Sequence, residues 1–155
     1  MLSIRNIQSR DILSLADTFI QQDETYFNTL YIDHLQTTRH SLIAVQPSND
    51  GERLYLGYGS VVWESGYTQF WRRNIPEITD LFVQVAYRRQ EIATQLIRAC
   101  EKASQERGFS SIGISVEQSD TYQHAQALYQ KLGYQADSFG ITSRDNQLHL
   151  VKKLS

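Results

Sequence analysis

Hydrophobic residues recur at helical spacing early in the chain. The first apolar face consists of Ile12, Leu15, Ala16, Phe19 and Ile20. A second face with the same spacing consists of Phe27, Leu30, Tyr31, His34 and Leu35. Apolar positions three and four residues apart share one side of an α-helix, and Ser9 is a residue type favoured at helix N-caps. We therefore predict two consecutive helices, which follow a short strand at residues 2–7.

The pattern changes from helical to extended after residue 40. Residues 41–46 and 54–63 are rich in β-branched and aromatic side chains, and they flank the turn-forming stretch Pro47-Ser48-Asn49-Asp50-Gly51. Such a pair of segments around a turn predicts two antiparallel strands. Residues 78–83 form another apolar run, which we interpret as the next strand.

Helices and strands alternate in the second half. Residues 92–103 carry an apolar stripe at helical spacing, and Arg107-Gly108 is a typical helix end. A strand is predicted at residues 112–116, then a helix that Asp120 and Gln123 would cap and Gly133 would end. Residues 148–154 form the last strand. The order β-α-α-β-β-β-α-β-α-β predicts an α/β (α+β) fold, with a mixed sheet covered by helices.

The composition and charge argue against several classes of function. The 155 residues fit one domain, residues 1–155, and 41% apolar with 21% charged residues is typical of a globular protein. A net charge of −2 argues against nucleic-acid binding. The single Cys100 and four scattered histidines predict no metal site, and a reducing compartment. With no apolar run near the ~18 residues of a membrane span and no signal-peptide pattern, we expect a cytoplasmic protein without membrane contact.

The segment from Asp80 to Leu96 carries candidate chemistry. A strand ends near Val83, a short basic loop follows, and a long helix begins near Glu91. The first N–H groups of a helix lack internal partners and carry a partial positive charge, and Arg88 and Arg89 add two fixed charges. This arrangement indicates a phosphate or pyrophosphate site. The alternative is a solvated turn with two surface arginines.

Two blocks of the sequence resemble motifs of the GNAT superfamily of N-acetyltransferases. Tyr87-Arg88-Arg89-Gln90-Glu91-Ile92-Ala93-Thr94 resembles motif A, whose pattern is Gln/Arg-x-x-Gly-x-Gly/Ala. The stretch from Tyr122 to Tyr134, with its Ala, Leu-Tyr and Gly-Tyr markers, resembles motif B. The resemblance implies a GNAT-like, mostly antiparallel sheet flanked by helices on both faces, with central strands that splay apart. It also implies transfer of an acetyl group from acetyl-CoA directly to a primary amine of a small molecule or protein.

The same resemblance implies cofactor-binding residues. The backbone around Phe82, Val83 and Val85 would pair with the pantetheine arm. The pyrophosphate would be held by Arg88, Arg89, Gln90, Glu91, Ile92, Ala93 and Thr94. Dimers are common among such proteins, so a homodimer is a possible assembly.

Tyr129 and Glu77 are the catalytic candidates that the resemblance implies. Tyr129 belongs to the Leu-Tyr pair of motif B and would protonate the departing thiolate of CoA. It also shares the apolar face of its helix, so a purely structural place in the core is the alternative. Glu77, at the start of the fourth strand, would accept a proton from the amine; Asp80 is the reserve candidate, and an exposed strand-end residue is the alternative for Glu77.

Glu91 departs from motif A, which has glycine at this position. A carboxylate near a bound pyrophosphate would repel it, unless it turns into water or pairs with Arg88 or Arg89. Glu91 could also occupy the anion site itself by capping its own helix. The second functional hypothesis is therefore a degenerate GNAT-like module that binds CoA weakly or not at all and acts as a sensor or partner-binding domain.

Overall fold

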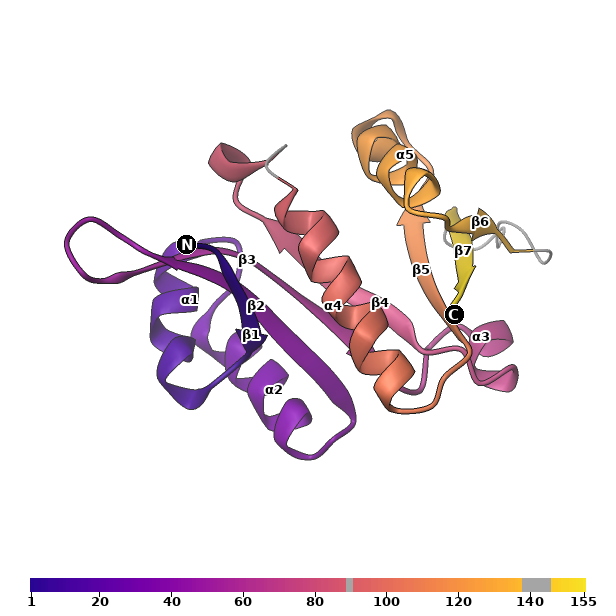
Figure 1. Ribbon diagram of the computed structural model, residues 1–155, viewed down its shortest axis with the longest axis horizontal. Coiled ribbons are helices and arrows are strands. Elements are labelled where there is room, and N and C mark those ends of the chain that lie inside the picture. Colours follow the sequence, from indigo (N-terminus) through magenta and orange to yellow (C-terminus); the bar gives the residue numbers. More distant parts are fainter. Residues whose placement is uncertain (89–90, 138–145) are drawn as a thin grey trace.

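A seven-stranded sheet organises the molecule, and the computed structural model describes residues 1–88, 91–137 and 146–155 (Figure 1). The strand order is β1-β2-β3-β4-β5-β7-β6. The strands are β1 (Ser3–Asn6), β2 (Arg39–Pro47), β3 (Arg53–Val62), β4 (Glu77–Val83), β5 (Ser111–Glu117), β6 (Gln135–Ala136) and β7 (Gln147–Lys153). Only β4 and β5 run parallel, and every other neighbouring pair is antiparallel. The predicted mixed, mostly antiparallel sheet is confirmed.

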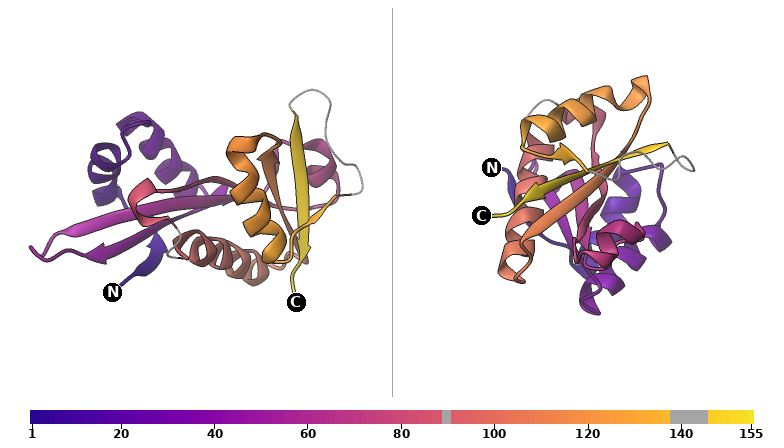
Figure 2. Two further views of the ribbon diagram at one scale, coloured as in Figure 1. Left: turned by 90° about the horizontal axis from the view of Figure 1, so that it is seen from above. Right: turned by 90° about the vertical axis from the view of Figure 1, so that its right-hand side faces the viewer.

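Helices cover both faces of this sheet (Figure 2). They are α1 (Ile12–Thr18), α2 (Glu24–Leu35), α3 (Thr68–Arg72), α4 (Ile92–Glu106) and α5 (Gln123–Lys131). Successive residues of a strand point to opposite faces. On β2, Leu42 and Ala44 accordingly join the core cluster under α4, whereas Ile43 and Val45 pack with α1 and α2. None of the helices in these residue ranges is long and apolar enough to cross a membrane.

Several local predictions were wrong. Residues 9–11 form a 3₁₀ turn that begins after Gln8, so Ser9 is not the cap of α1, and Ile20 is 83% exposed. Asp120 opens a 3₁₀ turn and accepts a hydrogen bond from the side chain of Gln123, so it does not cap α5. The five-residue α3 and the two-residue β6 were not predicted, because elements this short show no periodicity.

The central strands β4 and β5 separate after a short shared segment. They pair at Glu77↔Gly113 and Ile78↔Ile114, the only β4–β5 pairs within the described ranges. Just beyond, the register between β3 and β4 shifts, and Asp80 adopts a φ of 53°. An extra residue in one strand bends it away from its neighbour. The bulge at Asp80 therefore accounts for the divergence of β4 from β5, and the expected splayed strands are confirmed (Figure 1).

Gly113 is needed at the junction because α3 packs directly onto it. A Cβ atom at this position would lie 2.4 Å from Cε2 of Phe70, whose side chain is fully buried. We expect Gly113→Ala to lower the free energy of unfolding by about 1–3 kcal/mol, as overpacking does elsewhere. Urea denaturation measures this change. Gly66→Ala is the matched control, because a Cβ there meets nothing within 4 Å. Equal urea midpoints for the two variants would show that Phe70 moves aside without a loss of stability.

Candidate active site

The end of β4 presents backbone groups that β3 does not use. The N–H of Gln84 donates to the carbonyl of Leu56 at 2.9 Å, which fixes the side of β4 that faces β3. Backbone groups alternate along a strand, so those of Val83 face the opposite side, where β5 has diverged. The carbonyl of Val83 accepts a hydrogen bond from Nε of Arg88 at 3.1 Å. The guanidinium of Arg88 also lies 5.4 Å from the ring centre of Phe82.

This contact brings three predicted cofactor-binding residues together at one end of β4. Phe82, Val83 and Arg88 lie in contact there, and Val85 in the following turn is 72% exposed. A carbonyl oxygen has two lone pairs, so the bond from Arg88 leaves Val83 able to accept a second donor. Arg89 and Gln90, which were predicted to hold the pyrophosphate, lie outside the described residues.

The helix α4 begins next along the chain and packs against β4. Glu91 is the N-cap, with φ 64° and ψ 16°, the left-handed region that favours glycine. Its side chain makes no capping hydrogen bond here, and whether Glu91 occupies the anion site stays a prediction. Ile92 is buried, whereas Ala93 and Thr94 are half-buried. The helix therefore begins with N–H groups that no side chain of Glu91 covers.

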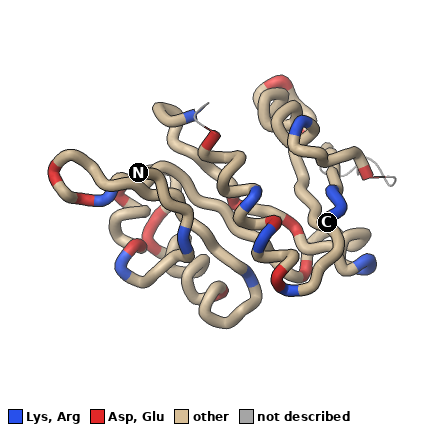
Figure 3. The backbone as a smooth tube through the Cα atoms, viewed as in Figure 1, with Lys and Arg blue, Asp and Glu red and all other residues tan. Residues whose placement is uncertain are grey.

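Charges in this region are mixed. Arg88 precedes the start of α4 and Glu91 begins it, and both are exposed. Figure 3 shows Lys and Arg interspersed with Asp and Glu along the described backbone. No group of three His, Cys, Asp or Glu residues in residues 1–88, 91–137 or 146–155 is arranged to hold a metal ion. Among the described residues of the turn, a positive charge at Arg88 thus stands close in sequence to a negative charge at Glu91.

Tyr129 lies in α5, inside the core cluster that contains residues of both diverging strands. The same cluster contains Val83 of β4 and Ile114 of β5. The side chain is 9% exposed, and burial raises the pKa of its phenol to about 12. Within the described part of the chain its hydroxyl has no hydrogen-bond partner. Tyr129 therefore keeps its proton at neutral pH and has it available for donation.

Glu77 stands where β4 and β5 still pair, opposite Gly113. Its Oε1 accepts a hydrogen bond from the hydroxyl of Ser65 at 2.5 Å, and that hydroxyl in turn accepts one from the N–H of Tyr67 at 2.9 Å. Oε2 of Glu77 has no partner among the described residues. One oxygen of this half-buried carboxylate is therefore held in place while the other can accept a proton.

Asp80, three residues further along β4, has both oxygens occupied. The hydroxyl of Tyr26 donates to Oδ1 at 2.7 Å, and Nη1 of Arg39 donates to Oδ2 at 2.8 Å. Burial, together with this bond to Asp80, raises the pKa of Tyr26. Sequence reasoning missed Tyr26 and Arg39 as partners of Asp80, because only the fold brings α2 and the start of β2 to the bulge. Both oxygens of Asp80 therefore accept hydrogen bonds from other side chains, whereas within the described residues only one oxygen of Glu77 does.

Comparison with known proteins identifies relatives of this architecture. The sequence profile of the Acetyltransferase (GNAT) family matches residues 6–134. No curated protein sequence matches the chain. Three solved structures resemble it over nearly the whole length of both chains. The first is yncA from Salmonella typhimurium, solved with its cofactor acetyl-CoA, at 14% identity and a TM-score of 0.74 over 100% of this chain and 95% of that one. The second is PaiA N-acetyltransferase from Thermoplasma acidophilum in complex with coenzyme A, at 15% identity and a TM-score of 0.69 over 99% of each chain. The third is an acetyltransferase of the GNAT family from Staphylococcus aureus Mu50, at 17% identity and a TM-score of 0.68 over 100% of each chain. At these identities, the structural likeness establishes the fold alone.

Proposed function

The chain belongs to the GNAT family of acetyltransferases, and from that premise we propose that it transfers an acetyl group from acetyl-CoA to a primary amine. The observation that carries the proposal is the divergence of β4 from β5 beside the start of α4. Beyond Ile78, β4 has no strand partner on this side among the described residues, and α4 begins shortly after β4 in the chain. An extended amide-containing chain can pair with such an edge, and a phosphate can bind such a helix end.

The residues present suit this cosubstrate, with one exception. Backbone groups of Val83 would hold the amides of the pantetheine arm, and the first N–H groups of α4 with Arg88 would hold the pyrophosphate. The exception is the carboxylate of Glu91 at the same turn. Acetyl-CoA would supply a thioester whose carbonyl carbon an amine can attack without a covalent enzyme intermediate.

Glu77 would act on the amine. An ammonium ion is not nucleophilic, so a proton must leave it before it reacts. Oε2 of Glu77 would accept that proton, directly or through water, while the bond from Ser65 to Oε1 fixes the orientation of the carboxylate. Tyr129 would provide a proton from Oη to the departing sulfur. The proposal thus assigns the base to β4 and the acid to α5.

Glu77→Gln tests the base. We expect kcat/KM to fall about a hundredfold near neutral pH, at the low end for general-base catalysis because water can relay the proton. Asp80→Asn is the comparison variant, since Asp80 is the reserve candidate; we expect a smaller loss, because both oxygens of Asp80 are already engaged. Steady-state kinetics over a range of pH measures both. A larger loss of turnover in Asp80→Asn than in Glu77→Gln would show that Asp80, and not Glu77, is the base.

An assay of thiol release with a panel of primary amines tests the function itself. Small amines and peptides with free N-terminal or lysine amines should be included, because the acceptor is a small molecule or a protein. Acceptor-dependent release of CoA is the expected result. Binding of acetyl-CoA without turnover on any amine would contradict the transferase, and absence of binding would favour the second candidate function.

That second candidate is a module that has lost catalysis and serves as a sensor or partner-binding domain. One observation favours it: Glu91 stands at a left-handed position where the motif has glycine. Calorimetric titration with acetyl-CoA distinguishes the two functions, because only the transferase needs the cosubstrate.

A further inference from the structure

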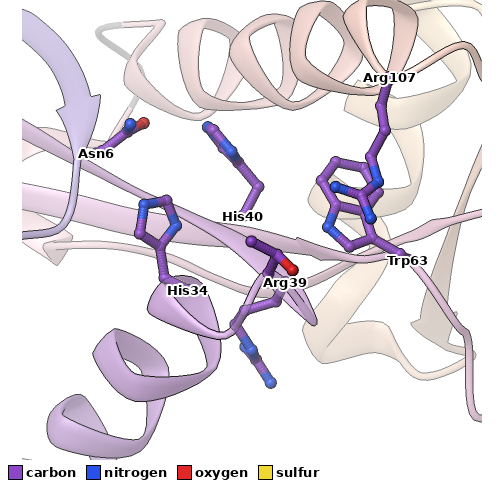
Figure 4. A pocket seen from close by; sticks show the side chains of 7 residues that line it. Asn6, His34, Arg39, His40, Trp63 and Arg107 are labelled. Carbon is purple, nitrogen blue, oxygen red and sulfur yellow. The ribbon is translucent and has the colours of Figure 1, made fainter.

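A cavity of about 250 Å³ lies at the opposite end of α4 from the candidate active site (Figure 4). It is formed by the end of β1, the end of α2, the start of β2 and the residue that follows α4. Its lining includes Asn6, His34, Thr37, His40, Trp63 and Arg107. Figure 4 shows Asn6, His34 and His40 turned toward one another and Arg107 lying against Trp63. The cavity therefore gathers nitrogen-bearing side chains from elements far apart in the sequence.

The side chains around this cavity offer hydrogen-bond donors. Nδ1 of His34 accepts a hydrogen bond from the N–H of Ser41 at 3.0 Å, so in the neutral ring the proton lies on Nε2. Trp63 and Arg107 can only donate. The guanidinium carbon of Arg107 lies 4.5 Å from the ring centre of Trp63, and no carboxylate pairs with it in the described part of the structure. The stacking contact thus holds Arg107 in place and leaves its N–H groups available.

His40 lies between these groups. Its ring centre is 5.2 Å from that of His34 and 6.4 Å from that of Trp63. Among the residues that the structure describes, its imidazole makes no hydrogen bond. His40 therefore adds either one donor as a neutral ring or two as a cation.

No carboxylate is among the described residues that line the cavity. The nearby acids are engaged elsewhere. Asp33 and Asp80 pair with Arg39 at 3.6 Å and 2.8 Å, and Figure 4 shows Arg39 directed away from the other side chains. Glu106, which precedes Arg107, is 3.9 Å from Lys102 and exposed. Donors of Arg107, Trp63 and the two histidines therefore converge on this space, where the side-chain acceptors of Asn6 and Thr37 are uncharged.

We propose that this cavity binds a small, doubly charged oxyanion of the sulfate or phosphate type. Such an anion accepts several hydrogen bonds at once, and its charge complements Arg107 and the histidines. The site is separate from the turn that would hold a pyrophosphate, because α4 lies between them. The proposal does not depend on the acetyltransferase activity.

Binding of the oxyanion becomes tighter as the pH falls. Burial lowers the pKa of His40, and the neighbouring His34 and Arg107 lower it further, while Glu106 raises it. Burial also lowers the pKa of His34. His40 therefore binds a proton less readily in the free protein than an ordinary histidine does. An anion favours the protonated ring, so it raises the pKa of His40 and takes up a proton on binding. Affinity therefore increases from about pH 8 to about pH 6.

Tryptophan fluorescence tests the proposal. The chain has two tryptophans, so Trp71→Phe leaves Trp63 as the only reporter. Sulfate is the probe, because it stays doubly charged over this pH range, and chloride at equal ionic strength is the control. We expect a saturable change in Trp63 emission with at least tenfold higher affinity at about pH 6 than at about pH 8.

Arg107→Met is the decisive variant, because methionine keeps contact with the indole but offers no donor. We expect it to weaken sulfate binding at least tenfold with an unchanged melting temperature. Inorganic phosphate and phenyl phosphate then separate a free anion from the phosphate group of a larger ligand: equal affinities identify the free anion, and tighter binding of phenyl phosphate identifies an organic phosphate. Emission that responds equally to sulfate and chloride, or equal sulfate affinity in Arg107→Met, would overturn the proposal.

Discussion

Glu91→Gly is expected to tighten acetyl-CoA binding by up to about a thousandfold. Two unit charges ~4 Å apart repel by about 4 kcal/mol at an effective dielectric of 20, which corresponds to that factor. The carboxylate of Glu91 is exposed, and solvent screening reduces the effect below this upper bound. Glycine also allows the backbone to approach the phosphates more closely. Isothermal titration calorimetry of both proteins measures the change.

The backbone of Glu91 adds a second effect, on stability. A residue with a side chain pays roughly 1–2 kcal/mol for the left-handed region, whereas glycine loses about 0.5–1 kcal/mol of chain entropy in folding. Glu91→Gly should therefore raise the free energy of unfolding by up to about 1 kcal/mol. Glu91→Gln is the matched control, because it removes the charge and keeps the strained backbone. Equal acetyl-CoA affinity in wild type, Glu91→Gln and Glu91→Gly would refute any obstruction by this side chain.

Tyr129→Phe is expected to lower kcat about a thousandfold and to leave acetyl-CoA affinity nearly unchanged. General-acid catalysis contributes roughly 10²–10⁴-fold, and phenylalanine keeps the packing of the ring while removing the proton. Because the pKa of Tyr129 is about 12, the wild-type phenol stays protonated through the neutral and mildly basic range. The loss of activity should therefore be the same at each pH in that range. Single-turnover and steady-state kinetics, together with calorimetry, measure the two quantities.

Tyr122→Phe is the control for this substitution. Tyr122 precedes the same helix, but its side chain is 43% exposed and outside the core cluster. An unchanged kcat in Tyr129→Phe would show that Tyr129 contributes only to packing in the core. The hydroxyl of Tyr129 has no bonding partner in the described residues, so its removal should cost little stability and should not obscure the kinetic result.

Regular patterns in the sequence were enough to predict most of the sheet and its helices. The β-branched and aromatic residues along 41–46 and 54–63, on either side of a turn-forming stretch, identified β2 and β3, and the stripe from Ile92 to Cys100 identified α4. The family resemblance supplied the candidate site, including the position of Glu91 at the start of that helix. Its cofactor-binding and catalytic roles stay predictions.

Contacts between segments far apart in the chain could not be predicted from the sequence. The positive φ of Asp80 depends on how β4 aligns with β3, and its partners Tyr26 and Arg39 come from other elements. The same holds for His40 and Arg107, which are 67 positions apart in the numbering and meet only at one cavity. Residue type alone does not reveal such contacts, because within its own segment each of these residues resembles an ordinary exposed polar residue.

The short junction between β4 and β5 has a mechanical consequence. Only the pairs at Glu77 and Ile78 join the strands β1–β4 to the strands β5–β7 within the described sheet. A small rotation about these two pairs changes the separation of the strand ends without stretching any other interstrand bond. We therefore expect the sheet to bend more easily at this junction than elsewhere. Phe70, which packs against Gly113, lies directly at the junction.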